Sequence, residues 1–446
     1  MLTVSPTQSR DLRLLTSTFI LVKSIIFVIP QLVLQQYDTS SQLLFVSPKV
    51  PEIVNYVLPR FLVWDTVFFI HIAQRGYVYE QEWAFGWLWT GAIRYVGNWI
   101  VAPIIALLWN ETSSVDEVGQ PVGSLYAYAI AAILIAHACH YLAVITLYAV
   151  STKIEKDLRA LETEASSGRS VSGANFPLVA ALLYIISPGG VFMSAGYAET
   201  LFAFFGFLGI FLREINQHIL AGLSFAITCG LRGNGVLWGI IFLNDLYEAV
   251  QLKRWKKSVG VIIGGSLIGI GFLSGQVYAY YRYCPGRPWC DNAIPSIFGF
   301  VQSHYWNNGF LKYWRTWQIP NFLFAFPTWF LFWRSFLRYR NVPRFRPYVI
   351  IQMLMFVMSL LFWHVQIITR VGTCMPLVYW HVAQRIYADE PLDDASENIR
   401  YPLTIKGIIR RGKADFKKHE GAWAVRYMLT WILVQAVLFA SFLPPA

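Results

Sequence analysis

The most conspicuous carboxylate in this sequence is Asp65, which follows Trp64 inside the apolar, aromatic stretch 61–72. A carboxylate that is partly removed from water at a membrane surface becomes a stronger base, which suits the deprotonation of a hydroxyl group near neutral pH. The tryptophan beside it would stack against a sugar ring. The alternative interpretation is that Asp65 only caps or solvates an interfacial helix, and the spacing alone leaves both open.

Residues 59–75 are expected to form one helix along a membrane surface, with its large apolar side chains in the interface. On a straight helix, Trp64 and Asp65 point about 100° apart. Only one of them would then reach a substrate, while the other packs.

Two arginines in apolar surroundings are candidates for binding an anion. Arg232 lies beside Asn234 in LRGNG (231–235), and Arg370 follows Gln366 by one helical turn. Charged side chains in such segments are costly unless they are paired. Guanidinium binds phosphate bidentately, so a lipid phosphate is the natural ligand, and a buried acid is the alternative partner.

His364 belongs to the same cluster only under one condition. It lies two residues before Gln366, so on a straight helix the two side chains point in opposite directions. Gly372 and Pro376 indicate a helix break that would bring them together. A lone histidine is more often structural than catalytic.

Five further polar residues are candidates for substrate binding. A carboxylate in the first turn of a helix also simply complements the helix dipole, and dense aromatic residues also form interfacial belts. The candidates are Glu80, then Tyr197 and Glu199 after the SPGG breaker (187–190), and Asn307 and Gln318 in the aromatic stretch 302–322.

The cysteine pair Cys284 and Cys290 closes a short proline-containing segment, YCPGRPWC. In an oxidising compartment this spacing favours a disulfide over free thiols. A metal site is a weaker alternative, because no second Cys/His pair lies beside it apart from His304. We predict no metal site.

The composition predicts an all-α, polytopic membrane protein formed by a single domain, residues 1–446. Hydrophobic residues make up 56% and charged residues 14% of the 446 residues, whereas about a quarter of a soluble protein is charged. About eleven apolar segments have the length of a membrane-spanning helix. They lie near 14–35, 85–108, 124–150, 175–193, 197–213, 218–243, 259–281, 319–337, 346–364, 366–385 and 425–443.

The net charge of +11 comes largely from short loops such as KRWKK (253–257), together with 334–346 and 406–413. This distribution follows the positive-inside rule and argues against nucleic-acid binding. It predicts an amphipathic first lumenal loop (36–84), a second lumenal loop (282–318) and a cytoplasmic loop (386–424). The predicted spans between 85 and 243 give an inconsistent parity, so either 85–108 or the 197–243 region contains a segment that does not fully cross.

Taken together, these stretches resemble the GPI mannosyltransferase 2 family of the endoplasmic reticulum. The likeness covers most of the chain in the family's order. It rests on WDTVFFIHIAQRGYVYEQEWAF, SPGGVFMSAGYAETLF, LRGNG, YCPGRPWC, YWNNGFLKYWRTWQIPNFLFAFP and HVQIITRVGTCMPLVYW.

The resemblance implies a GT-C glycosyltransferase of the endoplasmic-reticulum membrane, with a lumenal active site in which Asp65 is the catalytic base and Trp64 its essential neighbour. It implies dolichyl-phosphate mannose as donor, no separate cofactor, and α1,6 transfer to a mannosyl-glucosaminyl-phosphatidylinositol acceptor. It also implies a small membrane partner subunit. The alternatives are another enzyme that uses a dolichyl-phosphate sugar, or a lipid scramblase or transporter. The latter would predict repeat-related broken helices, and the sequence shows no such symmetry.

Overall fold

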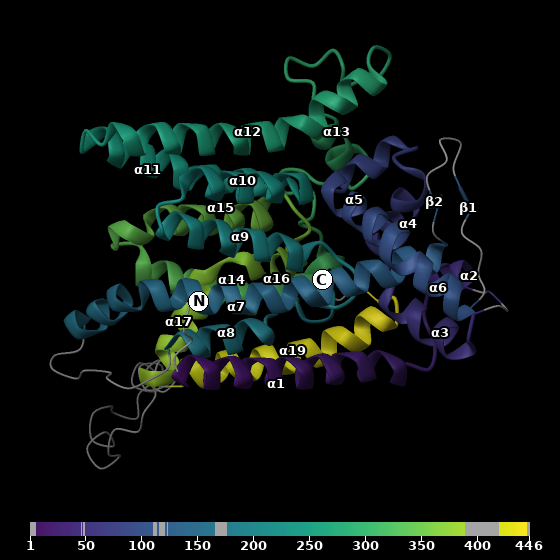
Figure 1. Cartoon of the computed structure of the whole chain (residues 1–446), viewed down its shortest axis with the longest axis horizontal. Coiled ribbons are helices and arrows are strands. Elements are labelled where there is room, and N and C mark those ends of the chain that lie inside the picture. Colours follow the sequence, from purple (N-terminus) through teal and green to yellow (C-terminus); the bar gives the residue numbers. More distant parts are fainter. Residues whose placement is uncertain are drawn as a thin grey trace.

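The computed structural model describes residues 6–45, 47, 50–109, 114–115, 121–122, 124–165, 176–388 and 419–443. These residues form a bundle of helices (Figure 1). The described residues also include one element that the all-α expectation lacks, a small antiparallel hairpin of β1 (Ser114–Val115) and β2 (Pro121–Val122).

Long helices that lie side by side form the body of the bundle (Figure 1). Shorter helices complete it, with α10 packed between α9 and α12 and α7 packed against α8 and α9. The long helices are α1 (Pro6–Val28), α7 (Leu125–Ala165), α12 (Trp255–Tyr283), α14 (Ile319–Tyr339), α19 (Glu420–Ala440) and α15 (Arg346–Leu361), the last within the helical segment Pro343–Leu361 of 19 residues. The shorter ones are α8 (Phe176–Ile185), α9 (Glu199–Glu214), α10 (His218–Leu231), α11 (Gly239–Gln251) and α17 (Pro376–Ala388).

The protein is polytopic, with six helical segments long and apolar enough to cross a membrane, or seven if one bent pair is counted, among the described residues. This is fewer than the eleven segments expected. Several predicted segments form shorter helices because glycine, proline or arginine interrupts their backbone hydrogen bonding. Thus α8 ends before the SPGG sequence, and α10 ends immediately before Arg232.

One apolar segment lies across the ends of other helices. It comprises α5 (Trp87–Val96), a π-helical turn η4 (Gly97–Val101) and α6 (Ala102–Trp109). The segment and the preceding Gly86 pack on the last turn of α10, on the final third of α12 and on the first turn of α7, through the contacts Gly86–Leu231, Trp87–Gly275 and Gly97–Tyr128. We call this the site end of the bundle; it lies at the right in Figure 1.

The opposite end, which we call the basic end, carries residues 253–257, the last three of which already belong to α12, and the turn between α14 and α15, with the short helix η8 (Pro343–Phe345). Glu420 at the start of α19 binds Arg334 at 2.7 Å and Arg385 at 3.1 Å there. The predicted loop 386–424 therefore begins and ends in helix at this end, and its residues 389–418 lie outside the described part of the chain.

The expectation of one helix over 59–75 in the first loop is wrong, because the structure has two helices there. The helical segment 52–61, which ends in η2 (Leu58–Phe61), is separate from α4 (Asp65–Arg75), and the chain bends by 112° between them. Large apolar residues such as Phe61 and Phe69 are buried against the protein core and do not lie in a membrane interface. The loop's other short helices are α2 (Ser40–Leu44), α3 (Glu52–Val57) and η3 (Glu80–Ala84), and η1 (Ile29–Leu32) precedes the loop.

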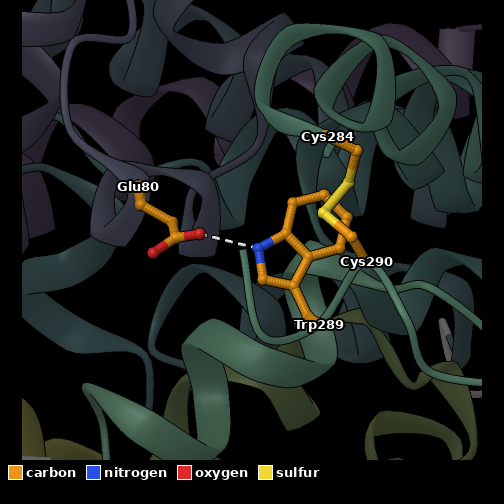
Figure 2. The surroundings of a disulfide bond; sticks show 4 residues. All are labelled: Glu80, Cys284, Trp289 and Cys290. Atoms are coloured by element: carbon orange, nitrogen blue, oxygen red, sulfur yellow. Dashed lines mark hydrogen bonds between the residues drawn. A yellow bond between two sulfur atoms is a disulfide. The ribbon is translucent and has the colours of Figure 1, made fainter. Parts of the chain in front are cut away.

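Cys284 and Cys290 form a disulfide, which is the pairing that their spacing favours (Figure 2). Trp289, between them, is fully buried and donates its indole N–H to Glu80 Oε1 at 2.6 Å. Tyr305, just after α13 (Ile297–His304), donates its hydroxyl to the other oxygen of Glu80 at 3.3 Å. Burial and the Glu80 carboxylate both raise the pKa of Tyr305. Glu80 thus fastens the first loop to the disulfide loop.

We expect the double substitution Cys284→Ser/Cys290→Ser to lower the free energy of unfolding by about 2 kcal/mol. The bond closes a loop with a sequence separation of 6, and closure removes chain entropy from the unfolded state. The measurement is the thermal unfolding midpoint of the purified protein with and without reductant. Wild-type protein should lose stability on reduction and the double variant should not respond; equal responses would contradict the assignment.

Candidate active site

The backbone break before α4 sets the position of Asp65. Trp64 has a φ of 61°, a left-handed conformation that costs a non-glycine residue about 1–3 kcal/mol. Donors from elsewhere hold this turn: the Tyr197 hydroxyl binds the Val63 carbonyl at 2.7 Å, and the Ser41 hydroxyl binds the Leu62 carbonyl. Because Trp64 is not helical, the 100° separation expected from a straight helix does not apply.

Asp65, at the end of this turn, belongs to a network of two acids and two arginines, with Glu199, Arg232 and Arg370. Arg232 Nη1 donates to Glu199 Oε1 at 2.5 Å, and Arg370 reaches the same oxygen at 2.8 Å. Arg370 Nη2 also lies 3.5 Å from Asp65 Oδ2. Both arginines therefore pair with buried acid, and Glu199 Oε2 has no partner among the described residues. Four segments distant in sequence converge at this point.

Arg370 is held more firmly than Arg232. Its guanidinium lies over the rings of Phe192 and Tyr197, at 4.2 Å and 4.7 Å from their centroids. Arg232 lies in extended backbone between α10 and the short helix η6 (Gly233–Trp238), which also carries Asn234. The side chain of Arg232 is 23% exposed, against 9% for Arg370 and 1% for Glu199. Arg232 is thus the more exposed arginine of the pair.

The segment between α8 and α9 leads into Glu199, the first residue of α9, and so sets the position of this carboxylate in the network. It contains η5 (Gly190–Met193) and ends at Tyr197 and Glu199. Lys23 of α1 is buried and donates to the Met193 carbonyl at 2.6 Å and to Ser194 Oγ at 2.7 Å. Gln435 of α19 accepts from Val191 N at 3.0 Å. Two flanking helices therefore fix the segment that presents Glu199.

We expect Gly190→Ala to lower the free energy of unfolding by about 3 kcal/mol. Gly190 has a φ of +47°, and an added Cβ would lie 2.1 Å from Gln435 Oε1. The substitution would add left-handed strain and displace Gln435 from Val191 N. Gly239→Ala is the matched control because a Cβ at Gly239 meets nothing within 4 Å. Similar unfolding midpoints for the two variants would refute this account.

Two polar residues after α15, His364 and Gln366, gather around Tyr313, and we call these three residues the polar wall. The helix is broken there into η9 (Val365–Ile367), α16 (Ile368–Val371) and η10 (Gly372–Cys374), so the expected helix break is present. His364 stacks on Tyr313 at 4.7 Å, and its Nε2 lies 3.0 Å from the Trp306 carbonyl. Burial lowers the pKa of His364, although Trp306 and Asp65 act in the opposite direction. Gln366 is buried, and its Oε1 has no partner among the described residues.

The remaining predicted site residues take different positions. Gln318, in the short helix η7 (Thr316–Gln318), accepts from Asn321 at 2.6 Å, and Asn321 donates to Tyr313 at 2.8 Å, so Gln318 adjoins the polar wall. Asn307 is exposed with a φ of 51°. Tyr197 is fully buried, so it holds the turn at Val63 and has no surface for a ligand. Glu80 lies in the disulfide cluster, where both of its oxygens accept from aromatic side chains.

Lys23 and Gln435 are the residues that the motifs did not single out. A signal for Lys23 existed, because an ionisable residue inside an apolar segment is by default a functional or pairing residue. Gln435 in the last apolar segment is a weaker signal of the same kind. Their roles in holding the segment 187–198 depend on contacts across 170 and 244 residues, which no local pattern reveals.

The exposed parts of the site are Trp64, whose residue is 40% exposed, and Asp65, whose side chain is 27% exposed. Asp65 Oδ1 makes no hydrogen bond with a described residue, while Oδ2 faces Arg370. An accessible carboxylate thus lies in front of guanidinium groups, at one end of an apolar helical bundle. A carboxylate that can accept a proton and guanidinium groups that can bind an anion are the groups that glycosyl transfer from a lipid phosphate requires.

Comparison with known proteins defines the family. The family model described as Mannosyltransferase (PIG-V) matches residues 12–158, 167–345 and 341–446. GPI mannosyltransferase 2 of Yarrowia lipolytica is 36% identical over 429 residues, which cover 96% of this chain and 97% of that protein. The Candida albicans protein of the same name is 30% identical, with 96% and 98% covered. The chain belongs to the GPI mannosyltransferase 2 family and is a mannosyltransferase.

Proposed function

We propose that this enzyme adds the second mannose of the glycosylphosphatidylinositol anchor, by α1,6 transfer from dolichyl-phosphate mannose to a mannosyl-glucosaminyl-phosphatidylinositol. The observation that carries the proposal is the placement of Asp65 in front of the Glu199–Arg232–Arg370 network. The network offers positive charge for a phosphate, and Asp65 offers a proton acceptor with a free oxygen.

The reaction is a direct displacement with inversion. The acceptor hydroxyl attacks C1 of the β-linked mannose, its proton passes to Asp65 Oδ1, and the bond from C1 to the phosphate oxygen breaks. Dolichyl phosphate leaves with the bonding electrons. Phosphate is a good leaving group, so one carboxylate base suffices where a glycosidase needs an acid as well.

Arg232 is the phosphate-binding residue in this proposal, since it is the more exposed arginine of the pair. Its guanidinium neutralises the charge that grows on the leaving phosphate. Arg370, fixed by two aromatic rings and Glu199, orients Asp65 through its Oδ2. One arginine thus binds the phosphate, and the other orients the carboxylate base.

The polar wall and Trp64 hold the sugars. Trp64 is exposed and lies beside Phe442 with ring centroids 5.6 Å apart, so its free face is available for stacking. Gln366 Oε1, buried without a donor among the described residues, suits a sugar hydroxyl. Asn234, Asn307, Gln318 and His364 supply further hydrogen-bonding groups around the same region. Glu80 does not contact the sugars in this proposal and influences the site only through its hydrogen bonds to Trp289 and Tyr305.

The membrane topology follows if 87–109 stays at the lumenal surface and α10 and α11 cross separately on either side of Arg232. The chain then crosses about eleven times, as in the GT-C architecture. Alternate crossings place 253–257 and 338–346 in the cytoplasm and Asp65 in the lumen of the endoplasmic reticulum. Non-helical backbone within the membrane, such as 187–190, is tolerated because it is buried in protein. A small membrane subunit would bind outside this core.

A transfer assay tests the function. Membranes that lack the endogenous activity, and that express this chain, receive dolichyl-phosphate mannose with labelled mannose and the one-mannose acceptor lipid. We expect a lipid product larger by one hexose, whose new residue is released by an α1,6-specific mannosidase. Label in serine- or threonine-linked protein instead would favour a protein O-mannosyltransferase, and movement of lipid without transfer would favour a scramblase.

A further inference from the structure

A polar cavity of about 280 Å³ opens at the basic end, remote from Asp65. It lies where the turn between α9 and α10 meets α11, the start of α12 and the segment before α15. Its charged and titratable lining residues are Arg213, Glu214, His218, Asp245, Lys257 and Arg344. The mannosyl transfer described above uses none of them.

The acids of this cavity already have partners. Arg213 binds Asp245 through two hydrogen bonds, at 2.8 Å and 2.6 Å, and also binds Glu214 at 2.9 Å. Arg344 binds the other oxygen of Glu214 at 2.5 Å. Two arginines therefore balance two carboxylates, and the remaining charge of the cavity comes from Lys257.

Lys257 makes no ion pair with any residue that the structure describes, and it lies at the start of α12. His218, the first residue of α10, is only 8% exposed, and its Nδ1 has no hydrogen-bond partner among the described residues. The N-terminus of α10 adds unpaired backbone N–H groups to the same region. The cavity thus combines excess positive charge with unsatisfied polar groups, which is the chemistry of an anion site.

The surroundings indicate that the anion belongs to a lipid. Trp255, in the first turn of α12 with Lys257, is 65% exposed, and Leu252 before this helix and Val259 in its second turn are also exposed. Tryptophan and basic residues occur together at the headgroup level of membranes, while exposed apolar residues face acyl chains. We infer that this cavity binds the phosphate of an anionic phospholipid from the leaflet at the basic end.

The bound headgroup would connect the α9–α10 turn to α12 and to the segment before α15. This turn joins the end of α9 to the start of α10. At their other ends, α9 begins with Glu199 and α10 ends with Leu231, the residue before Arg232. A ligand that binds only the folded protein stabilises it by mass action, so the lipid should raise the unfolding midpoint of the whole bundle.

The test compares two neighbouring lysines. Purified protein in neutral detergent is titrated with phosphatidylinositol, phosphatidylcholine or soluble inositol phosphate, and bound lipid is counted by native mass spectrometry. We expect Lys257→Gln to weaken phosphatidylinositol binding about tenfold, the effect of losing one charged hydrogen bond. Lys256→Gln makes the same change of charge outside the cavity lining and should alter binding less than about twofold.

Unchanged lipid binding in Lys257→Gln would overturn the proposed site. Equal weakening in both variants would also overturn it, because it would indicate a general attraction of the lipid to the basic surface. Equal affinity for phosphatidylcholine would exclude an anion site. Competition by inositol phosphate at the same concentration as the lipid would assign the cavity to a soluble phosphate. Unfolding midpoints measured without lipid verify that both variants are folded.

Discussion

Asp65→Asn should reduce mannosyl transfer by about 10³-fold while the protein folds normally. General-base catalysis contributes about 10²–10⁴ in rate, and the amide keeps the shape of the carboxylate but accepts no proton at neutral pH. The side chain is 27% exposed and forms one long contact with Arg370, so its replacement costs little stability. The measurement is the initial rate of product formation per amount of monodisperse protein.

Asp38→Asn is the matched control for that experiment. Asp38 lies in the same loop, is exposed, and accepts a hydrogen bond from Ser40 N at 2.7 Å that an asparagine can also accept. Its rate should stay within twofold of wild type. If Asp65→Asn retained full activity, the base would have to be another residue, and the mechanism proposed above would be wrong.

Glu199→Gln should both destabilise the protein and slow transfer by at least about 100-fold. Its Oε1 is shared by Arg232 and Arg370, and its side chain is 1% exposed. Removal of one partner from a buried ion pair costs about 3–5 kcal/mol. Arg370, released from Glu199, would pair more closely with Asp65 Oδ2, and Arg232 would lose the anchor that positions it for phosphate.

The control for Glu199 is Glu420→Gln at the basic end. Glu420 is also 1% exposed and also binds two arginines, Arg334 and Arg385. We expect a similar fall of the unfolding midpoint, with near-normal turnover in the fraction that remains folded. Equal losses of turnover in the two variants would show that Glu199 acts only through stability. A loss confined to Glu199→Gln would establish its role in orienting the site.

Several local features of the site could be predicted from residue types. The glycines and proline of SPGG and the glycines of LRGNG favour helix breaks, and α8 and α10 end at these sequences. The break before Asp65 could not be predicted, because residues 60–75 contain no glycine or proline to mark it. Hydroxyl groups of Tyr197 and Ser41, distant by 134 and 21 residues, supply the hydrogen bonds that make the break possible.

The assignment of Glu80 to substrate binding depended on its closeness to Asp65 in sequence. In the structure its carboxylate binds Trp289, a residue 209 positions away. Sequence distance is a poor guide here, since the whole of α4 and the turn at Gly76 lie between the two carboxylates. Whether Glu80 affects substrate affinity through the disulfide loop stays a prediction.

The sequence by itself determined that this is a membrane protein, where its basic loops lie, and which acids and arginines are available for chemistry. These properties follow from hydropathy and charge along the chain, which are local. Only the tertiary structure decided that Arg370 pairs with Glu199 and approaches Asp65, across 171 and 305 residues. Ion pairing depends on distances of a few ångströms between side chains, and helix packing alone sets those distances.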